Sequence, residues 1–231
     1  MKKIHVLLIP DGNRRWAKKK NLPVSEGHWR GAKVTEKILK KARDLKIKYF
    51  TIWASSLDNL KKREKEEVKT LIKIYKEYFE KLLKEKEIER EKVKVNVVGN
   101  WREVLPEDLK NLIEKVIEKT KKFKNYFLTI LLAYDGKKEM ESCIKKIVKE
   151  NPKNVDEKTI LKNLPTGFLP PVDLIIRTGC EKDPHNSAGV MMWHTAYSQF
   201  AFLKTYYPDF SPSKFEKIIK DFLKRERRFG A

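Results

Sequence analysis

Cysteine is scarce in this sequence of 231 residues, which holds only Cys143 and Cys180. Two cysteines do not provide the set of disulfides that holds small secreted domains together. We therefore expect both to be free thiols and the protein to work in a reducing, cytoplasmic compartment.

Long apolar runs are also missing. No run approaches the ~20 residues that a membrane-spanning helix needs, which excludes an integral membrane protein of the helical class. The first apolar run, residues 5–9, is too short for the core of a signal peptide. No internal repeat is present. With 40% hydrophobic residues the chain can bury one sizeable core, so we predict a single domain over residues 1–231.

Acidic residues are outnumbered: 32 Asp and Glu face 53 Lys and Arg, which gives a net charge of +21. Such a chain attracts polyanions, including nucleic acid, anionic lipid and phosphorylated ligands. Lysine and glutamate are interspersed, as in residues 61–67 and 84–87, which is typical of solvated helix faces. No basic-aromatic motif of a known DNA- or RNA-binding module is present, so we expect no specific nucleic-acid partner.

Five short runs of apolar, β-branched or aromatic residues predict strands, over residues 4–9, 48–54, 93–98, 126–132 and 172–176. Apolar residues at helical spacing separate them, and predict helices over 31–45, 65–89, from Pro106 onward, 137–150 and 213–228. This alternation predicts an α/β fold in which helices flank a mostly parallel central sheet on both faces.

Polar and charged residues follow every predicted strand. These segments begin at Asp11, Ala54, Gly99, Ala133 and Arg177. Ligands of open α/β sheets gather at the carboxyl ends of the strands. The sequence therefore predicts a polar, cation-rich site at this edge of the sheet.

The first of these segments has residues suited to a phosphorylated ligand. Asp11 is of the type that holds Mg²⁺ together with substrate phosphates, and Gly12 permits close approach of the backbone. Arg14, Arg15 and Arg177 can donate two hydrogen bonds each to phosphate oxygens. The alternative for this segment alone is an Asp-Gly turn with solvated arginines.

Taken together, the motifs resemble the cis-prenyltransferases of the undecaprenyl or polyprenyl diphosphate synthase type. The motifs that carry the resemblance are His5 to Trp16, Gly27-His28 with Gly31, Ser56 to Asn59, Pro171 to Gly179, Trp193 with Ala196 to Ser198, Pro208 to Phe210 and Arg225 to Gly230. The resemblance implies a central parallel sheet with a long hydrophobic tunnel, a homodimer, and Mg²⁺ as cofactor. It also implies condensation of isopentenyl diphosphate with a C10–C20 allylic diphosphate.

The resemblance implies roles for individual residues as well. Asp11 and Asn59 would be catalytic, and Asp11 would hold the Mg²⁺. Substrate binding would fall to Gly12, Asn13, Arg14, Arg15, Trp16, His28, Ser56, Asp58, Lys62, Arg177, Glu181 and Lys182. The arginine-rich end would complete the site of the neighbouring subunit, and the lipid product implies transient contact with a membrane surface.

The chain departs from the family pattern at several of these positions. Asp58 stands for a glutamate, Lys62 for an arginine and Gln199 for a glutamate that the family ties to Mg²⁺. The segment after Arg177 is about three residues longer than usual and has no arginine, so Lys182 and His185 would have to serve.

These departures keep alternatives open. One is a non-catalytic partner subunit on the same fold, and another is a prenyltransferase that uses a different acceptor. A zinc site from Cys180, His185 and His194 fits no standard ligand spacing. The sequence does not predict the primer or the product length.

Overall fold

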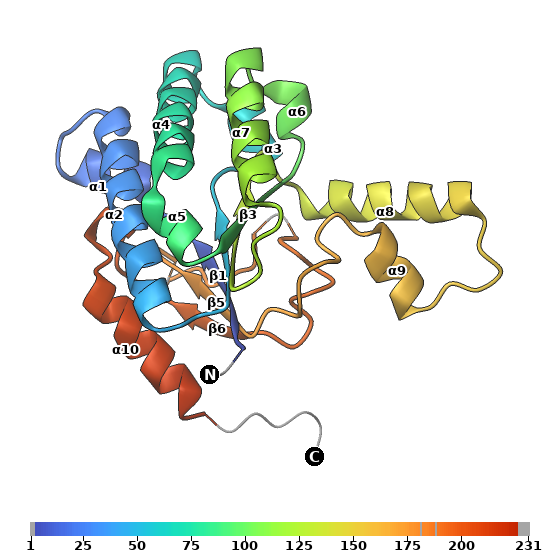
Figure 1. Ribbon diagram of the computed structural model, residues 1–231. Coiled ribbons are helices and arrows are strands. Elements are labelled where there is room, and N and C mark those ends of the chain that lie inside the picture. The colour runs from blue at the N-terminus through green and yellow to red at the C-terminus, as the bar shows by residue number, and fades with distance from the viewer. Residues whose placement is uncertain (1–2, 181, 188, 226–231) are drawn as a thin grey trace.

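The computed structural model describes residues 3–180, 182–187 and 189–225 and forms one α/β unit (Figure 1). Its sheet contains the strands β1 (His5–Ile9), β2 (Tyr49–Trp53), β3 (Val93–Val98), β4 (Tyr126–Leu131), β5 (Leu174–Arg177) and β6 (Gln199–Phe202). The strand order is β3-β4-β2-β1-β5-β6 and every pairing is parallel. The prediction of a parallel sheet flanked by helices is confirmed.

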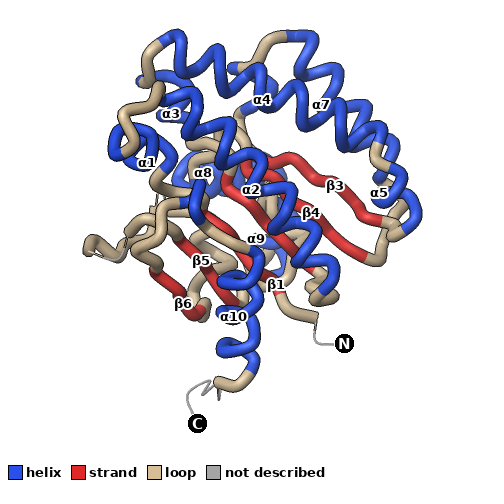
Figure 2. The backbone as a smooth tube through the Cα atoms, turned by 90° about the vertical axis from the view of Figure 1, so that its left-hand side faces the viewer, coloured by secondary structure: helices blue, strands red, loops and turns tan. Residues whose placement is uncertain are grey.

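The helices are α1 (Asn13–Lys19), α2 (Val24–Asp44), α3 (Leu57–Lys62), α4 (Lys65–Lys84), α5 (Lys86–Arg90), α6 (Trp101–Val104), α7 (Glu107–Thr120), α8 (Gly136–Glu150), α9 (Glu157–Asn163) and α10 (Pro212–Leu223), with a 3₁₀ turn at Tyr207–Asp209. Figure 2 shows α2, α4 and α7 running beside one another over the sheet. No helix in the described ranges is long and apolar enough to cross a bilayer.

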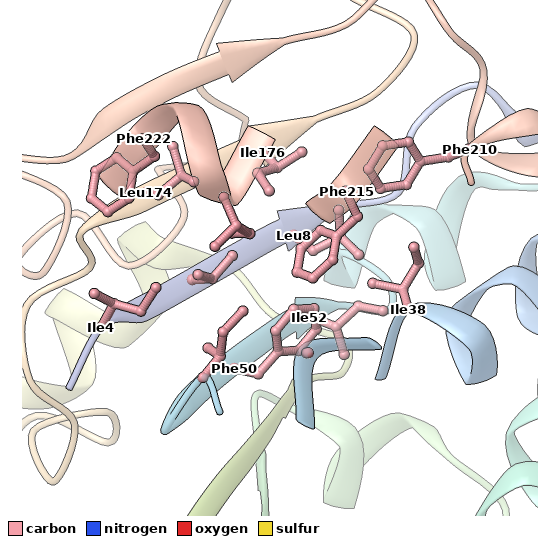
Figure 3. Packing of buried hydrophobic residues seen from close by; sticks show 14 of the residues in the cluster. Ile4, Leu8, Ile38, Phe50, Ile52, Leu174, Ile176, Phe210, Phe215 and Phe222 are labelled. Carbon is pink, nitrogen blue, oxygen red and sulfur yellow. The ribbon is translucent and has the colours of Figure 1, made fainter. Parts of the chain in front are cut away.

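The core lies on both faces of the strands, and β1 is buried along its whole length. On one face, side chains of β1, β2 and β5 pack against α2 and α10, with Leu8, Ile52 and Phe215 among them (Figure 3). At the β3 end of the same sheet, α4 and α7 pack over Val95 and Val97. Burying the large side chains contributes about 1.5–3 kcal/mol each before conformational entropy is counted.

The opposite face is covered differently from the sequence-based expectation. Leu7, Ile9 and Ile175 pack there against Leu169 and Met191, which belong to segments without strand or helix. Figure 1 shows α8 and α9 standing out from the body instead of lying on this face. Loops, rather than helices, therefore seal most of this side of the sheet.

Several predicted boundaries are wrong. The expected helix 65–89 is two helices, because Glu85 adopts an extended conformation and its side chain caps α5 by accepting from the Glu87 N–H. The helix expected from residue 31 begins at Val24. Strand β6 was not predicted. The last helix ends at Leu223, and residues 226–228 of the predicted 213–228 lie outside the described ranges.

Candidate functional site

Asp11 lies just beyond the end of β1 and contacts two arginines. Its Oδ1 accepts from Arg15 Nη2 at 2.8 Å, and its Oδ2 accepts from Arg177 Nη2 at 2.9 Å. Arg177, the last residue of β5, keeps only 7% of its side chain exposed, whereas Asp11 keeps 31%. A buried guanidinium is thus held against a carboxylate that still reaches solvent at this edge.

Backbone contacts fix the position of Asp11. Its carbonyl oxygen accepts from the Thr178 hydroxyl at 2.7 Å and from the Tyr207 N–H at 3.1 Å. The next residue, Gly12, has φ +104°, and a Cβ there would lie 2.7 Å from Cδ1 of Tyr206. Only glycine fits this turn without strain. The chain therefore turns sharply from β1 into α1 against the segment that follows β6.

Asn13 opens α1 and packs between that helix and α2. Its Nδ2 donates to the Pro10 carbonyl at 3.3 Å, while its buried Oδ1 has no partner in the described part of the chain. A Cβ on Gly31 would come within 2.5 Å of that Oδ1. An unpartnered buried acceptor costs free energy, so this oxygen is a candidate ligand for a donor or a cation.

A second polar cluster surrounds Glu67 of α4, whose carboxylate is only 8% exposed. It accepts from His28 Nε2 at 2.8 Å and from Arg63 Nη1 at 2.9 Å, and Arg14 Nε lies 3.7 Å away. Burial lowers the pKa of His28, and the Glu67 hydrogen bond opposes this shift. Glu67 therefore holds His28 and two arginines in one place, and the sequence analysis did not select it.

Ser56 and Asn59 cap α3 reciprocally. The Asn59 N–H donates to the Ser56 hydroxyl at 3.0 Å, and the Ser56 N–H donates to Asn59 Oδ1 at 3.3 Å. Asp58 and Lys62 form an exposed ion pair at 2.6 Å on the outside of the same helix. The cation of this segment that contacts the buried cluster is Arg63 instead of Lys62. Its side chain is 21% exposed and pairs with Glu67. A capping signal, Ser-x-x-Asn, is visible in the sequence and predicts this helix start.

The remaining predicted residues occupy varied positions. Trp16 is buried in α1 with its Nε1 unpartnered among described residues. Lys182 is exposed, and Glu181 lies outside the described ranges.

Arg177 Nη1 donates to the His185 carbonyl at 2.8 Å, which ties the lengthened segment to the site. Gln199 accepts from Arg225 at 2.9 Å, and the rest of the arginine-rich end is not described.

A cavity of about 1050 Å³ lies between the sheet and the helices α2 and α4. At one end it is lined by Pro10, Asn13 and His28, which belong to the polar edge. At the other end it reaches Ile47 and Tyr126, where β2 and β4 begin. This volume is at the upper limit of the ~300–1,000 Å³ usual for small-molecule pockets. The cavity thus runs from residues beside the polar strand ends into a largely apolar interior.

The donor set fits a magnesium ion that a substrate shares. Within the described ranges no group of three or more His, Cys, Asp or Glu side chains is arranged to hold a metal. Mg²⁺ is commonly held by one or two carboxylates with substrate phosphates and waters completing its shell. The partly exposed Asp11 carboxylate, whose two oxygens accept from Arg15 and Arg177, would be the single protein ligand of such an ion.

Comparisons with known proteins match this chain to prenyl diphosphate synthases. A family model described as putative undecaprenyl diphosphate synthase matches residues 9–230. A Thermococcus kodakarensis protein named tritrans,polycis-undecaprenyl-diphosphate synthase (geranylgeranyl-diphosphate specific) is 38% identical, over 98% of this chain and 86% of its own length. The isoprenyl transferase of Aquifex aeolicus is 37% identical, over 98% and 95%.

Solved structures share the fold. Lavandulyl diphosphate synthase from Lavandula x intermedia, in complex with dimethylallyl diphosphate, superposes with a TM-score of 0.90 at 29% identity over 98% of both chains. A probable undecaprenyl diphosphate synthase from Campylobacter jejuni gives a TM-score of 0.79 over the full length of both chains, and at 23% identity it supports the fold alone.

Proposed function

Because this chain belongs to the undecaprenyl diphosphate synthase family, we propose that it condenses isopentenyl diphosphate with an allylic diphosphate to build a cis-polyprenyl diphosphate. The observation that carries the proposal is that the cavity reaches Pro10 and Asn13, the residues on either side of the turn that holds Asp11 against Arg177. A diphosphate needs cations and a growing hydrocarbon needs an apolar wall, and the two meet here.

The proposed reaction breaks the allylic C–O bond, and the diphosphate leaves with the bonding electrons. The double bond of isopentenyl diphosphate forms the new C–C bond to the allylic carbon, which leaves positive charge on the tertiary carbon of the former double bond. The carbon next to that centre then gives up a proton to the released diphosphate or to solvent. Negative charge grows on the leaving diphosphate, so donors aimed at it lower the barrier. Mg²⁺ held by Asp11 would supply further charge stabilisation there.

Specific roles follow from where the side chains lie. Arg15 and Arg177 would exchange part of their contact with Asp11 for phosphate oxygens, since a guanidinium can serve carboxylate and phosphate in the same way. His28, neutral because burial lowers its pKa, would act as a hydrogen-bond donor or acceptor rather than as a fixed charge. Ser56 and Asn59, locked by their mutual capping, would present a rigid helix start.

The proposal also specifies the length of the allylic primer. Of the C10, C15 and C20 allylic diphosphates, we favour C20, because the Thermococcus and Pyrococcus relatives are named as geranylgeranyl-diphosphate specific. A C20 tail also makes fuller use of a cavity of about 1050 Å³ than a C10 tail does.

A turnover assay tests the proposal. Purified protein, labelled isopentenyl diphosphate and each primer are incubated with Mg²⁺ or with EDTA, and products are separated by length. Labelled polyprenyl diphosphate that requires Mg²⁺ and disappears in Asp11→Ala supports the synthase. The matched control is Asp44→Ala, which removes a carboxylate at the far end of α2. No incorporation with any primer would favour a non-catalytic partner subunit or another acceptor.

We also propose a homodimer, with α8 and α9 in the interface. Ile144 and Val148 on α8, together with Val155 before α9, are exposed apolar side chains on the part of the molecule that stands away from the body (Figure 1). Light scattering should give twice the chain mass for the native protein. An Ile144→Lys/Val148→Lys variant should shift toward the single-chain mass. A variant that keeps the mass of the native protein would reject this interface.

A further inference from the structure

The edge of the sheet opposite the site, where the strands begin, gathers lysines from three loops. We define the lysine edge as residues 44–48, 90–92 and 121–125, which precede β2, β3 and β4. The loops are joined by backbone hydrogen bonds: the Phe127 N–H donates to the Lys48 carbonyl at 2.9 Å, and the Asn125 N–H donates to the Lys92 carbonyl at 3.2 Å. Loops far apart in sequence therefore lie side by side where these strands begin.

The charge of this surface is largely uncompensated. No carboxylate lies within ion-pairing distance of Lys46, Lys48, Lys92, Lys122 or Lys124 in the described ranges. Lysines on the helices behave differently, since many of them pair with a glutamate one turn away, as Lys145 does with Glu141. Two carboxylates belong to the edge, Asp44 and Glu91, and the latter already contacts Arg90.

Aromatic rings lie under two of these ammonium groups, those of Lys48 and Lys92. Lys48 Nζ is 5.9 Å from the ring centres of both Tyr49 and Phe127, and Lys92 Nζ is 5.1 Å from that of Phe123. Tyr49 and Phe127 stack on each other at 4.9 Å. Lysine stems with aromatic rings beneath them are typical of surfaces that meet lipid headgroups, where the ring is apolar and the cation faces phosphate.

The apolar cavity ends at the same edge. Its lining includes Ile47, which precedes β2, Val93, which begins β3, and Tyr126 and Phe127, the first two residues of β4. A chain that grows from the Asp11 site has its far end here. The lysine edge is therefore the surface nearest to the hydrocarbon terminus of the product.

We propose that the lysine edge docks the protein on an anionic lipid bilayer, with the far end of the cavity facing the headgroups. Lys46, Lys92 and Lys124 contribute the attraction to lipid phosphates, and the half-buried rings settle at the headgroup level. A nucleic acid fits less well, because the rings are covered by lysine stems and offer no open face for base stacking. The route of the product to the bilayer rests on the proposed function; the docking itself does not.

Vesicle co-sedimentation tests the docking. The native protein is mixed with vesicles of phosphatidylglycerol and phosphatidylcholine, or of phosphatidylcholine alone, at low and high salt. The edge variant is Lys122→Gln/Lys124→Gln, and the matched control is Lys18→Gln/Lys19→Gln on α1, which removes the same charge from exposed positions near the opposite edge. Each lysine at a charged membrane surface contributes about a fivefold factor, so the edge variant should bind anionic vesicles about thirtyfold more weakly.

The expected result is binding to anionic vesicles that weakens with salt and depends on the edge lysines but little on the control lysines. Equal weakening in both variants would overturn the proposal, because it would reflect net charge alone. Complete competition by random RNA at matched charge would overturn it in favour of general polyanion binding. Turnover in detergent is measured in parallel: an edge variant that turns over normally but does not bind vesicles separates docking from the condensation.

Discussion

Arg177 Nη2 contacts Asp11 Oδ2 at 2.9 Å across a sequence separation of 166 residues. The pair places a buried cation and a partly exposed carboxylate at the ends of the adjacent strands β1 and β5. Asp11→Asn keeps the shape and removes the charge, so we expect kcat to fall by about 10²–10³-fold, as when a donor or ion at a developing charge is lost. Steady-state kinetics at saturating Mg²⁺ measure this.

Asp44→Asn serves as the control for that substitution, since it changes the net charge equally at the far end of α2. A native kcat in Asp11→Asn would exclude the carboxylate from the reaction.

Arg63 and Lys62 offer a direct contrast. Arg63 contacts Glu67 beside His28, while Lys62 pairs with Asp58 on the exposed side of α3. Because charge-assisted contacts in a sheltered cluster are stronger than exposed pairs, Arg63→Gln should lower kcat/KM about tenfold more than Lys62→Gln does. Parallel kinetics on the two variants decide the order, and the reverse order would make Lys62 the cation that meets substrate.

The cavity predicts a graded effect on product length. Ala32 and Ala42 both line it on α2, and ten residues of helix separate them by about 15 Å. Leucine at either position would fill part of the cavity and block the growing chain there. Ala32→Leu lies nearer to His28 at the polar end, so it should shorten the product more than Ala42→Leu. Overpacking should destabilise each variant by about 1–3 kcal/mol. Chromatography of dephosphorylated products gives the lengths, and unchanged lengths in both would mean that the chain grows elsewhere.

Buried histidines make stability depend on pH. Burial lowers the pKa of His5 and of His194 to about 4. The unfolded chain takes up these protons below about pH 6.5 while the folded chain does not, so the free energy of unfolding falls as pH drops from about 6.5 to 4, by up to roughly 3 kcal/mol for each histidine.

Urea unfolding of the native protein and of His194→Met at several pH values in this range tests the prediction. Nε2 of His194 has no partner among described residues, but the ring hydrogen-bonds the Thr166 backbone, so methionine should cost some stability at every pH while removing the titration. The variant shares every other titrating group. The slope of its unfolding free energy against pH should therefore be smaller by the equivalent of about one bound proton. Parallel curves for the two proteins would show that His194 does not titrate on unfolding.

Much of the fold could be predicted because parallel strands carry local signals. The run His5–Ile9 is apolar and ends at Asp11, and both the strand and the polar edge after it are found in the structure. The break at Glu85 could not be predicted, because lysine and glutamate favour helix on both sides of it. Contacts from elsewhere decide it, including the ion pair of Glu87 with Arg43 on α2.

The site was only partly predictable for a similar reason. Asp11, Arg15 and Arg177 follow strands, and strand ends converge by geometry alone. Glu67 sits within a lysine- and glutamate-rich helix and resembles its solvated neighbours in sequence. Only its packing against His28 and Arg63 distinguishes it, and that depends on how α4 crosses α2.

The placement of β1 between β2 and β5 has a consequence during synthesis. β2 ends at Trp53, but β5 begins only at Leu174, so a growing chain holds β1 with one neighbour for more than a hundred residues. An apolar strand with an unpaired side invites pairing with other chains. The chain on the ribosome therefore exposes an apolar strand edge that the finished protein covers.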